Sequence, residues 1–515
     1  MGTNGLLAVF AIILAWYTLL TDEKRTDFKL RITYLYSAFI CSLLLIIMII
    51  VYSPILINIL PVNPIPWYFG FTEDTMAFTC LCLIVIFFGA KLLGKTIPKA
   101  NYKKWVHYSE KYLRAKKFEQ LGFLLDKYHE QLFKVLNNKA WSVRLRNKLY
   151  PNRFLRLKAK KTNSFLDNPS IMKIRKYLAS LLPKNDKEQE LIQLNISRLL
   201  KSKAFLVYLS DTYPHIAMKA TSLHLRDHEE YVTSYFTHLI SLPGSDLYRE
   251  LRDNQNRSHT GEYFLDESNP LLNYYFDDMN VAIEVKIWKP IGDYLEVFIK
   301  EQKGKNNYYN KHDIHFSSND ERWNCPIFVG VFFFDVMVTL SIFKRSKYHM
   351  WLMYYKYFLT AILENRECHE DVDQNKEFPV RFDYLIYQII SNCSKWVGAI
   401  EYLDYTNWSQ DNIKISPEHF ASKCLGEMMH LIITSSKIEM QQKSYLLEIV
   451  IRVMHNLDQR QHNYFSKCIF DNIIRSYEGS PVNEATIVML REVYSDVDHV
   501  IKHENSTFER ELSKL

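Results

Sequence analysis

Four ionisable residues could together support metal-dependent chemistry: Asp266, Asp278, Glu284 and Lys286. Glu284 and Lys286 lie in VAIEVKIWKPIGDYLEVFIKE, where apolar residues alternate with others on both sides of KPIGD. That period of two, rich in β-branched residues, predicts a β-hairpin at about 281–300 with both side chains on one strand face. Asp and Glu would hold Mg²⁺, while Lys would polarise a water that attacks a phosphodiester. An exposed hairpin with ordinary cross-strand charges explains the same pattern without any chemistry.

A second candidate constellation is a pair of histidines, His224 and His228, in the sequence HLRDHEE. Residues four apart share one face of a helix, so the two rings could bind zinc. Leu225 stands where a zinc protease has its glutamate. The chain has 17 histidines, so one such spacing is expected by chance, and a solvated helical face is the alternative.

A third feature is the basic segment, which we define as residues 143–161, VRLRNKLYPNRFLRLKAKK. It contains no Asp or Glu, and its basic residues are Arg144, Arg146, Lys148, Arg153, Arg156, Lys158, Lys160 and Lys161. Residues 101–161 carry seventeen Lys and Arg against four Asp and Glu, whereas the whole chain has a net charge of only +7. The rest of the chain is therefore net negative, and this region predicts an anionic ligand.

Three ligands fit the basic segment. Anionic lipid headgroups are one, because each Lys or Arg near a membrane surface contributes about 1 kcal/mol. Nucleic acid is another, because cations neutralise phosphates and aromatic rings stack on bases. The third is an acidic protein face, on a partner or in the net-negative remainder of this chain.

Three apolar runs at the start of the chain predict membrane spans at about 5–20, 32–53 and 75–94. The first run is short, and a signal sequence or a surface helix is its alternative. Basic residues follow the first and third runs, while the loop between the second and third has none. The positive-inside rule then predicts a multi-pass protein of the plasma (inner) membrane, with its N-terminus outside and its C-terminal region cytoplasmic.

A fourth apolar run, residues 326–345, has Asp335 at its middle. A carboxylate at the bilayer centre costs about 2.5–3.5 kcal/mol, and basic residues flank the run on both sides. We therefore expect a buried core helix rather than a fourth span.

The predicted fold is mainly α: three transmembrane helices followed by an irregular α-solenoid or helical bundle with one small β-hairpin. Apolar residues at helical spacing, such as those of residues 118–135 and 446–457, predict amphipathic helices. We expect a membrane region at 1–94 and a basic helical neck at 95–165. A helical segment at 166–260, a segment with the hairpin at 261–370 and a C-terminal helical segment at 371–515 follow.

Composition excludes several classes of site. Gly is scarce, with 14 residues, and neither a Walker A sequence nor a Gly-x-Gly-x-x-Gly loop occurs. The eight cysteines include no Cys-x-x-Cys pair, which argues against a cysteine zinc site or a disulfide framework. No cofactor is expected, apart from Mg²⁺ if the Asp and Glu-x-Lys residues are catalytic.

The leading functional hypothesis is a membrane-anchored cytoplasmic interaction or sensor module with a protein partner. Its more specific form is the membrane component of a bacterial anti-phage defence system, based on the Lys/Asn/Ile/Tyr-rich, Gly-poor composition. The alternative is a membrane-tethered, metal-dependent nuclease with an Asp and Glu-x-Lys site.

Overall fold

A computed structural model of the chain describes residue 15 and residues 17–52, 72–138, 141–149, 169–181 and 186–515, apart from 224, 305, 312–315, 317–319, 347–349, 368–371, 373–375, 406–408, 476–479 and 505. The chain forms two compact units, Met1–Tyr231 and Val232–Leu515. The predicted segment boundaries near 260 and 370 both fall inside the second unit.

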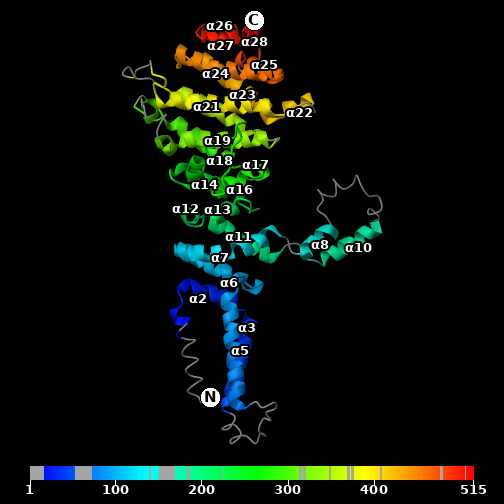
Figure 1. The fold of residues 1–515 in the computed structure, drawn as a ribbon. Helices are drawn as coiled ribbons and strands as arrows, with labels where there is room; N and C mark the ends of the chain where they lie inside the picture. Colours follow the sequence, from blue (N-terminus) through cyan, green and yellow to red (C-terminus); the bar gives the residue numbers. More distant parts are fainter. Residues whose placement is uncertain are drawn as a thin grey trace. The chain divides into compact units, whose positions relative to one another are not determined.

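The described residues are mainly helical, as predicted, and Figure 1 shows the helices in chain order. The helices of the first unit are α2 (Asp22–Arg31), α3 (Tyr34–Val51), α5 (Glu73–Leu93), α6 (Tyr102–Arg114), α7 (Phe118–Asn137), α8 (Trp141–Leu149), α10 (Pro169–Ser180), α11 (Lys187–Lys201), α12 (Lys203–Thr212) and α13 (Pro214–Ala220). Helix α14 (His228–Ser241) crosses the boundary between the units.

The second unit continues with α15 (Asp246–Asp253), α16 (Pro270–Phe276), α17 (Met279–Val285), α18 (Trp288–Glu301), α19 (Pro326–Phe343), α20 (Met353–Asn365), α21 (Arg381–Gly398), α22 (Gln410–Lys414), α23 (Pro417–Thr434), α24 (Met440–Gln459), α25 (Asn463–Ile473), α26 (Glu484–Ser495), α27 (His499–Glu504) and α28 (Ser506–Ser513). Most pack against a helix one or two places away in the chain, for example α19 on α21 and α23 on α25. Such local stacking is typical of a solenoid.

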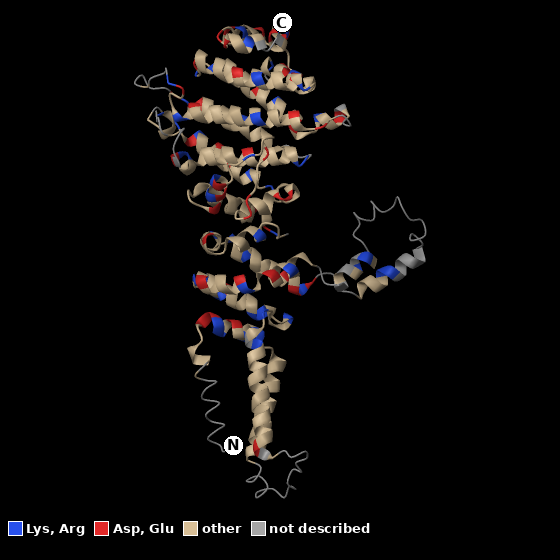
Figure 2. Ribbon diagram, viewed as in Figure 1, with Lys and Arg blue, Asp and Glu red and all other residues tan. Residues whose placement is uncertain are grey.

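Helices α3 and α5 pack side by side and are apolar along their length (Figure 1, Figure 2). Their contact is built from Leu43, Ile47 and Ile50 on one helix and Ala77, Cys80 and Ile84 on the other. Only 17% of residues 34–51 and 22% of residues 74–91 are buried, so most of the apolar side chains of these two helices face outward. Both are long and apolar enough to cross a membrane. The predicted first span, 5–20, lies almost entirely outside the described residues.

Helix α19 is also long and apolar enough to span a membrane, but 83% of it is buried within the protein. Gly330 allows this close packing, because a Cβ there would stand 2.0 Å from a methyl carbon of Leu295 on α18. Asp335, at the middle of α19, is only 1% exposed. The predicted buried core helix is therefore confirmed.

The carboxylate of Asp335 is satisfied by three donors. Trp396 Nε1 donates over 2.8 Å and Tyr263 Oη over 2.7 Å, and the guanidinium of Arg257 completes the set. A buried charge is tolerable only when it is paired and hydrogen-bonded. Two segments far apart in the chain, residues 257–263 and the part of α21 that holds Trp396, thus converge on the carboxylate of α19 inside the second unit.

The predicted β-hairpin at 281–300 is wrong, because this range forms α17 and α18, and the described residues contain no strand beyond an isolated bridge between Arg257 and Tyr263. The same apolar residues also fit a helical period: Ala282, Val285, Trp288, Ile291, Leu295 and Ile299 are all buried. Lys286 adopts a left-handed conformation, with φ of 59°, and ends α17. Pro290 lies in the first turn of α18, where a missing N–H costs nothing.

Replacing Arg257 with Met should leave the Asp335 carboxylate buried without its cation. Removing one partner of a buried pair costs about 3–5 kcal/mol, so the free energy of unfolding should fall by about 3 kcal/mol or more. Chemical denaturation of the full chain in detergent measures it. Lys300→Met, which removes an exposed pair with Glu296, is the control and should leave the midpoint unchanged. Equal midpoints for both variants would contradict this account.

Candidate functional site

A buried polar cluster of the first unit joins α2 to α7, and we call it the α2 clamp: Asp27, Arg31, Lys127 and Tyr128. Asp27 and Arg31 are one turn apart on α2, form an ion pair and are 5% and 2% exposed. Lys127 Nζ lies 2.8 Å from Asp27 Oδ2, and Tyr128 donates its hydroxyl proton to Asp27 Oδ1. The carboxylate therefore has three charged or polar partners from two helices.

Arg31 also extends the clamp to the end of α5. Its Nη1 donates to the carbonyl oxygen of Lys91 over 2.7 Å, and its Nε donates to Tyr128 Oη over 3.0 Å. A cation at this position complements the negative end of the α5 helix dipole. Because Arg31 lies just before α3, the start of α3 and the end of α5 lie at the same end of the apolar pair.

Two side-chain amides fix the chain that leaves α5. Asn101 Nδ2 donates to the carbonyl oxygens of Leu30 and Ile32, over 2.8 and 2.9 Å. Gln131 of α7 bonds both the N–H and the C=O of Ile97, over 2.8 and 2.7 Å. The segment between α5 and α6 is thus held to both α2 and α7.

Apolar burial surrounds the clamp. Phe28 of α2 packs against Phe88 of α5, with ring centroids 4.5 Å apart, and Trp105 of α6 meets Tyr128 edge-on. Burial raises the pKa of Tyr128 well above its ordinary value, and the hydrogen bond to Asp27 adds to the rise. The phenol therefore stays protonated and remains a donor to the carboxylate.

The basic segment falls largely outside the described residues, which include none of 150–168. Arg153, Arg156, Lys158, Lys160 and Lys161 lie in that gap. Helix α8 carries the other three predicted residues, Arg144, Arg146 and Lys148, and packs against α10; Figure 2 shows Lys and Arg on both helices.

Arg146 Nε donates to the carbonyl oxygen of Ala179 on α10 over 3.2 Å, while Lys148 is exposed. Arg175 of α10 returns a bond to the carbonyl oxygen of Lys148 over 3.0 Å. Part of the basic charge therefore holds α8 to α10.

The four predicted catalytic residues are all exposed. Asp266 accepts from the N–H of Ser268, and Asp278 caps α17 by accepting from the N–H of Asn280. Glu284 lies on α17 and Lys286 ends it. The strand on which Glu284 and Lys286 were expected to align is a helix, and the nuclease hypothesis itself stays a prediction.

Sequence reasoning missed a buried carboxylate nearby, Glu250 on α15, which is 0% exposed. It accepts from the N–H groups of Leu271 and Leu272, over 3.1 and 2.9 Å, at the start of α16. Burial raises the pKa of Glu250 to about 7, although the two backbone hydrogen bonds oppose the rise. Its role is to satisfy donors at the start of α16.

The predicted histidine pair is not seen among the described residues. Helix α14 begins at His228, whose Nε2 is hydrogen-bonded to the carbonyl oxygen of Thr221. Residues 225–227 are not helical, and His224 lies outside the described residues. A different group, Asp126, His129 and His215, brings ligand atoms within 4.8 Å of one another in the first unit.

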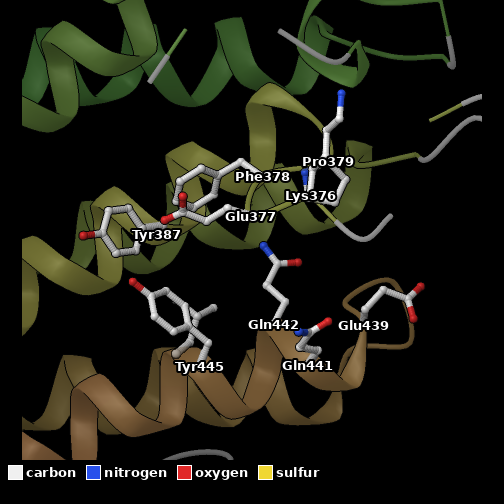
Figure 3. Close-up of a pocket in the computed structure, with 10 residues that line it drawn as sticks. Lys376, Glu377, Phe378, Pro379, Tyr387, Glu439, Gln441, Gln442 and Tyr445 are labelled. Carbon is white, nitrogen blue, oxygen red and sulfur yellow. The ribbon is translucent and has the colours of Figure 1, made fainter. Parts of the chain in front are cut away.

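A cavity of about 340 Å³ lies in the second unit between the segment before α21 and the start of α24 (Figure 3). Tyr387 and Tyr445 stack along one side, with ring centroids 6.1 Å apart and planes at 24°. Gln442 points into the space between the helices in Figure 3. Its amide nitrogen and oxygen are buried and have no hydrogen-bond partner among the described residues. The cavity therefore offers both a donor and an acceptor beside two aromatic rings.

Comparison of the chain with protein-family models, with curated proteins and with solved structures gave no match.

Replacing Asp27 with Asn should remove the anion that neutralises Arg31 and Lys127 while preserving the shape of the side chain. Uncompensated buried charge is strongly destabilising, so the free energy of unfolding should fall by about 3 kcal/mol. Thermal unfolding and limited proteolysis of the full chain in detergent measure the change. Asp22→Asn on the same helix, whose side chain is 72% exposed, is the matched control. Similar losses for both variants would contradict the clamp.

The stability of the second unit should depend on Glu250 between about pH 4.5 and pH 7. The folded chain keeps this proton up to a pKa of about 7, whereas the ordinary value is 4.5. Within that window the unfolded state binds fewer protons, so stability falls as pH rises, and it levels off above the window. Glu250→Gln should flatten this part of the curve of thermal midpoint against pH. Parallel curves for the two proteins would show that Glu250 does not titrate in this range.

Proposed function

We propose that the protein is an integral membrane protein whose cytoplasmic helices form an interaction or sensor module. The α2 clamp is the observation that carries this proposal. A passive anchor needs only a flexible linker, whereas here a buried ionic cluster holds α2, the end of α5 and α7 in one arrangement. Buried ion pairs add little stability over apolar packing, and their best-attested use is to specify geometry. A fixed joint of this kind suits the transmission of a change between α7 and the apolar pair.

The proposed orientation places the clamp on the cytoplasmic side of the plasma (inner) membrane, with the N-terminus outside. The residues of and around α2 and those after α5 are both basic, whereas the residues between α3 and α5 include no Lys or Arg. The positive-inside rule assigns the basic side to the cytoplasm. The clamp agrees with this assignment, because it holds α2 and α7 on the same side of the apolar pair.

The basic segment would then lie close to anionic headgroups, and we propose lipid as its ligand. About 50 residues separate α5 from the start of this segment, and α6 and α7 occupy most of them. Each Lys or Arg at the surface would contribute about 1 kcal/mol. Nucleic acid is the other anion that fits this composition, and release of co-purifying nucleic acid by high salt would favour it instead.

The cavity at Gln442 is the proposed recognition site for the partner. An unpaired primary amide beside stacked tyrosines suits a group that both donates and accepts, such as a peptide bond or a carboxamide side chain. A bacterial defence setting, in which the module responds to phage, is the more specific form of this proposal. Reduced plating of phage would be its cellular readout.

The test is site-specific photo-crosslinking of the full chain in cells, with a photoreactive phenylalanine at position 445 or at position 402. Tyr445 is 40% exposed and lines the cavity, while Tyr402 is 48% exposed and does not. A discrete adduct from position 445 that position 402 does not give is the expected result. A protein partner would shift the band on a gel, whereas a small ligand would change only the intact mass.

Identical patterns from the two positions would overturn the proposed recognition site. If Glu284→Ala then abolished the activity of the protein in cells, the nuclease alternative would take its place. Unaltered activity of that variant would eliminate the nuclease.

A further inference from the structure

Three potential metal ligands meet where α7 and α13 approach each other in the first unit. Asp126 and His129 are three residues apart on α7, and His215 is the second residue of α13. One ligand atom from each lies within 4.8 Å of those of the other two. Side chains three apart share one face of a helix, so α7 supplies two ligands and α13 the third.

The tautomer of His129 leaves one ring nitrogen ready to bind a metal. Its Nδ1 lies 2.7 Å from the carbonyl oxygen of Asp126, which can only accept, so Nδ1 carries the proton. The lone pair is therefore on Nε2. That atom is buried and has no hydrogen-bond partner among the described residues, and His129 as a whole is only 8% exposed. Metal-ligating histidines commonly hold the other ring N–H on a carbonyl or carboxylate in this way.

His215 completes the group from the opposite helix. Its Nε2 is 3.0 Å from Asp126 Oδ1, and its ring lies edge-on to His129 with centroids 5.4 Å apart. The side chains of Asp126 and His215 are 43% and 47% exposed, so solvent reaches one side of the group. An ordinary exposed ion pair would explain the contact between Asp126 and His215. It would not explain why the buried Nε2 of His129 has no hydrogen-bond partner among the described residues.

The sequence of α7 permits this approach of the two helices. Gly122 lies one turn before Asp126, and a Cβ there would be 2.7 Å from the Tyr213 ring. Any larger residue would push Tyr213 away from α7. Pro214 then begins α13, and its fixed φ suits the first helical turn. His215 therefore follows directly from a residue that is packed against α7.

We propose that Asp126, His129 and His215 bind one divalent transition-metal ion of the zinc class, with solvent in the remaining position. Two imidazoles and a carboxylate are ligands for Zn²⁺, Co²⁺ or Fe²⁺, whereas Ca²⁺ and Mg²⁺ prefer oxygen alone. Three protein ligands with an open side are typical of sites that exchange a ligand. The ion would link α7 to α13. Helix α7 also carries Lys127 and Tyr128 of the α2 clamp. The site does not depend on the proposed recognition cavity.

The experiment uses the full chain purified in detergent with a tag that contains no histidine, and then stripped of metal by a chelator. Co²⁺ is titrated as a spectroscopic probe, and Zn²⁺ is then added in competition. We expect one equivalent of Co²⁺ to bind, with visible ligand-field absorption that one equivalent of Zn²⁺ abolishes. His215→Ala should weaken binding by at least about 10-fold, and this partly exposed position should tolerate the change.

The matched control is His107→Ala, which removes an exposed histidine from α6 of the same unit. It should bind Co²⁺ as the unaltered chain does. The proposal fails if the unaltered chain shows no saturable binding, or if His215→Ala and His107→Ala bind equally. A normal circular dichroism spectrum for His215→Ala confirms that weakened binding is not caused by unfolding.

Discussion

An ion pair that lies within one turn of α2 governs the arrangement of the first unit. Asp27 and Arg31 are almost fully buried, so each must keep its partners or carry a large desolvation penalty. Those partners come from α2, from the end of α5 and from α7. The helices cannot separate without exposing or orphaning a charge, and this constraint gives the junction one defined geometry.

The second unit also buries carboxylates, among them Asp335 and Glu250, and these two have different hydrogen-bond donors. Asp335 is surrounded by a guanidinium, an indole N–H and a phenol. Glu250 has only two backbone N–H groups and a distant arginine, 4.0 Å from its Oε1. Burial then dominates, and the pKa of Glu250 rises to about 7. The number and the charge of the donors therefore differ between these two buried carboxylates.

Two faces of helix α7 contact different helices of the first unit. Lys127 and Tyr128 point toward α2 and form half of the clamp, while Asp126 and His129 meet His215 of α13. Consecutive residues on a helix are about 100° apart, so four neighbours can serve two different surfaces. A metal ion bound by Asp126, His129 and His215 would hold α7 to α13, while the α2 clamp holds α7 to α2. The clamp and the proposed metal site therefore share one helix but no residue.

The sequence by itself determined the helical class, the two described apolar helices near the N-terminus and the burial of residues 326–345. Helical spacing of apolar residues and the length of an apolar run are local features of the sequence, so they predict helices directly. A carboxylate at the centre of residues 326–345 is costly in lipid, so it predicts burial inside the protein. The sequence could not settle 281–300, because the apolar residues there fit both periods and only the left-handed Lys286 and the packing of Ile291 and Leu295 selected two helices. The clamp and the Asp126, His129 and His215 group were decided by tertiary structure alone. In each group, the contacts between helices join residues about 90 to 100 positions apart in the chain, and no local pattern encodes which distant side chain a buried charge will meet.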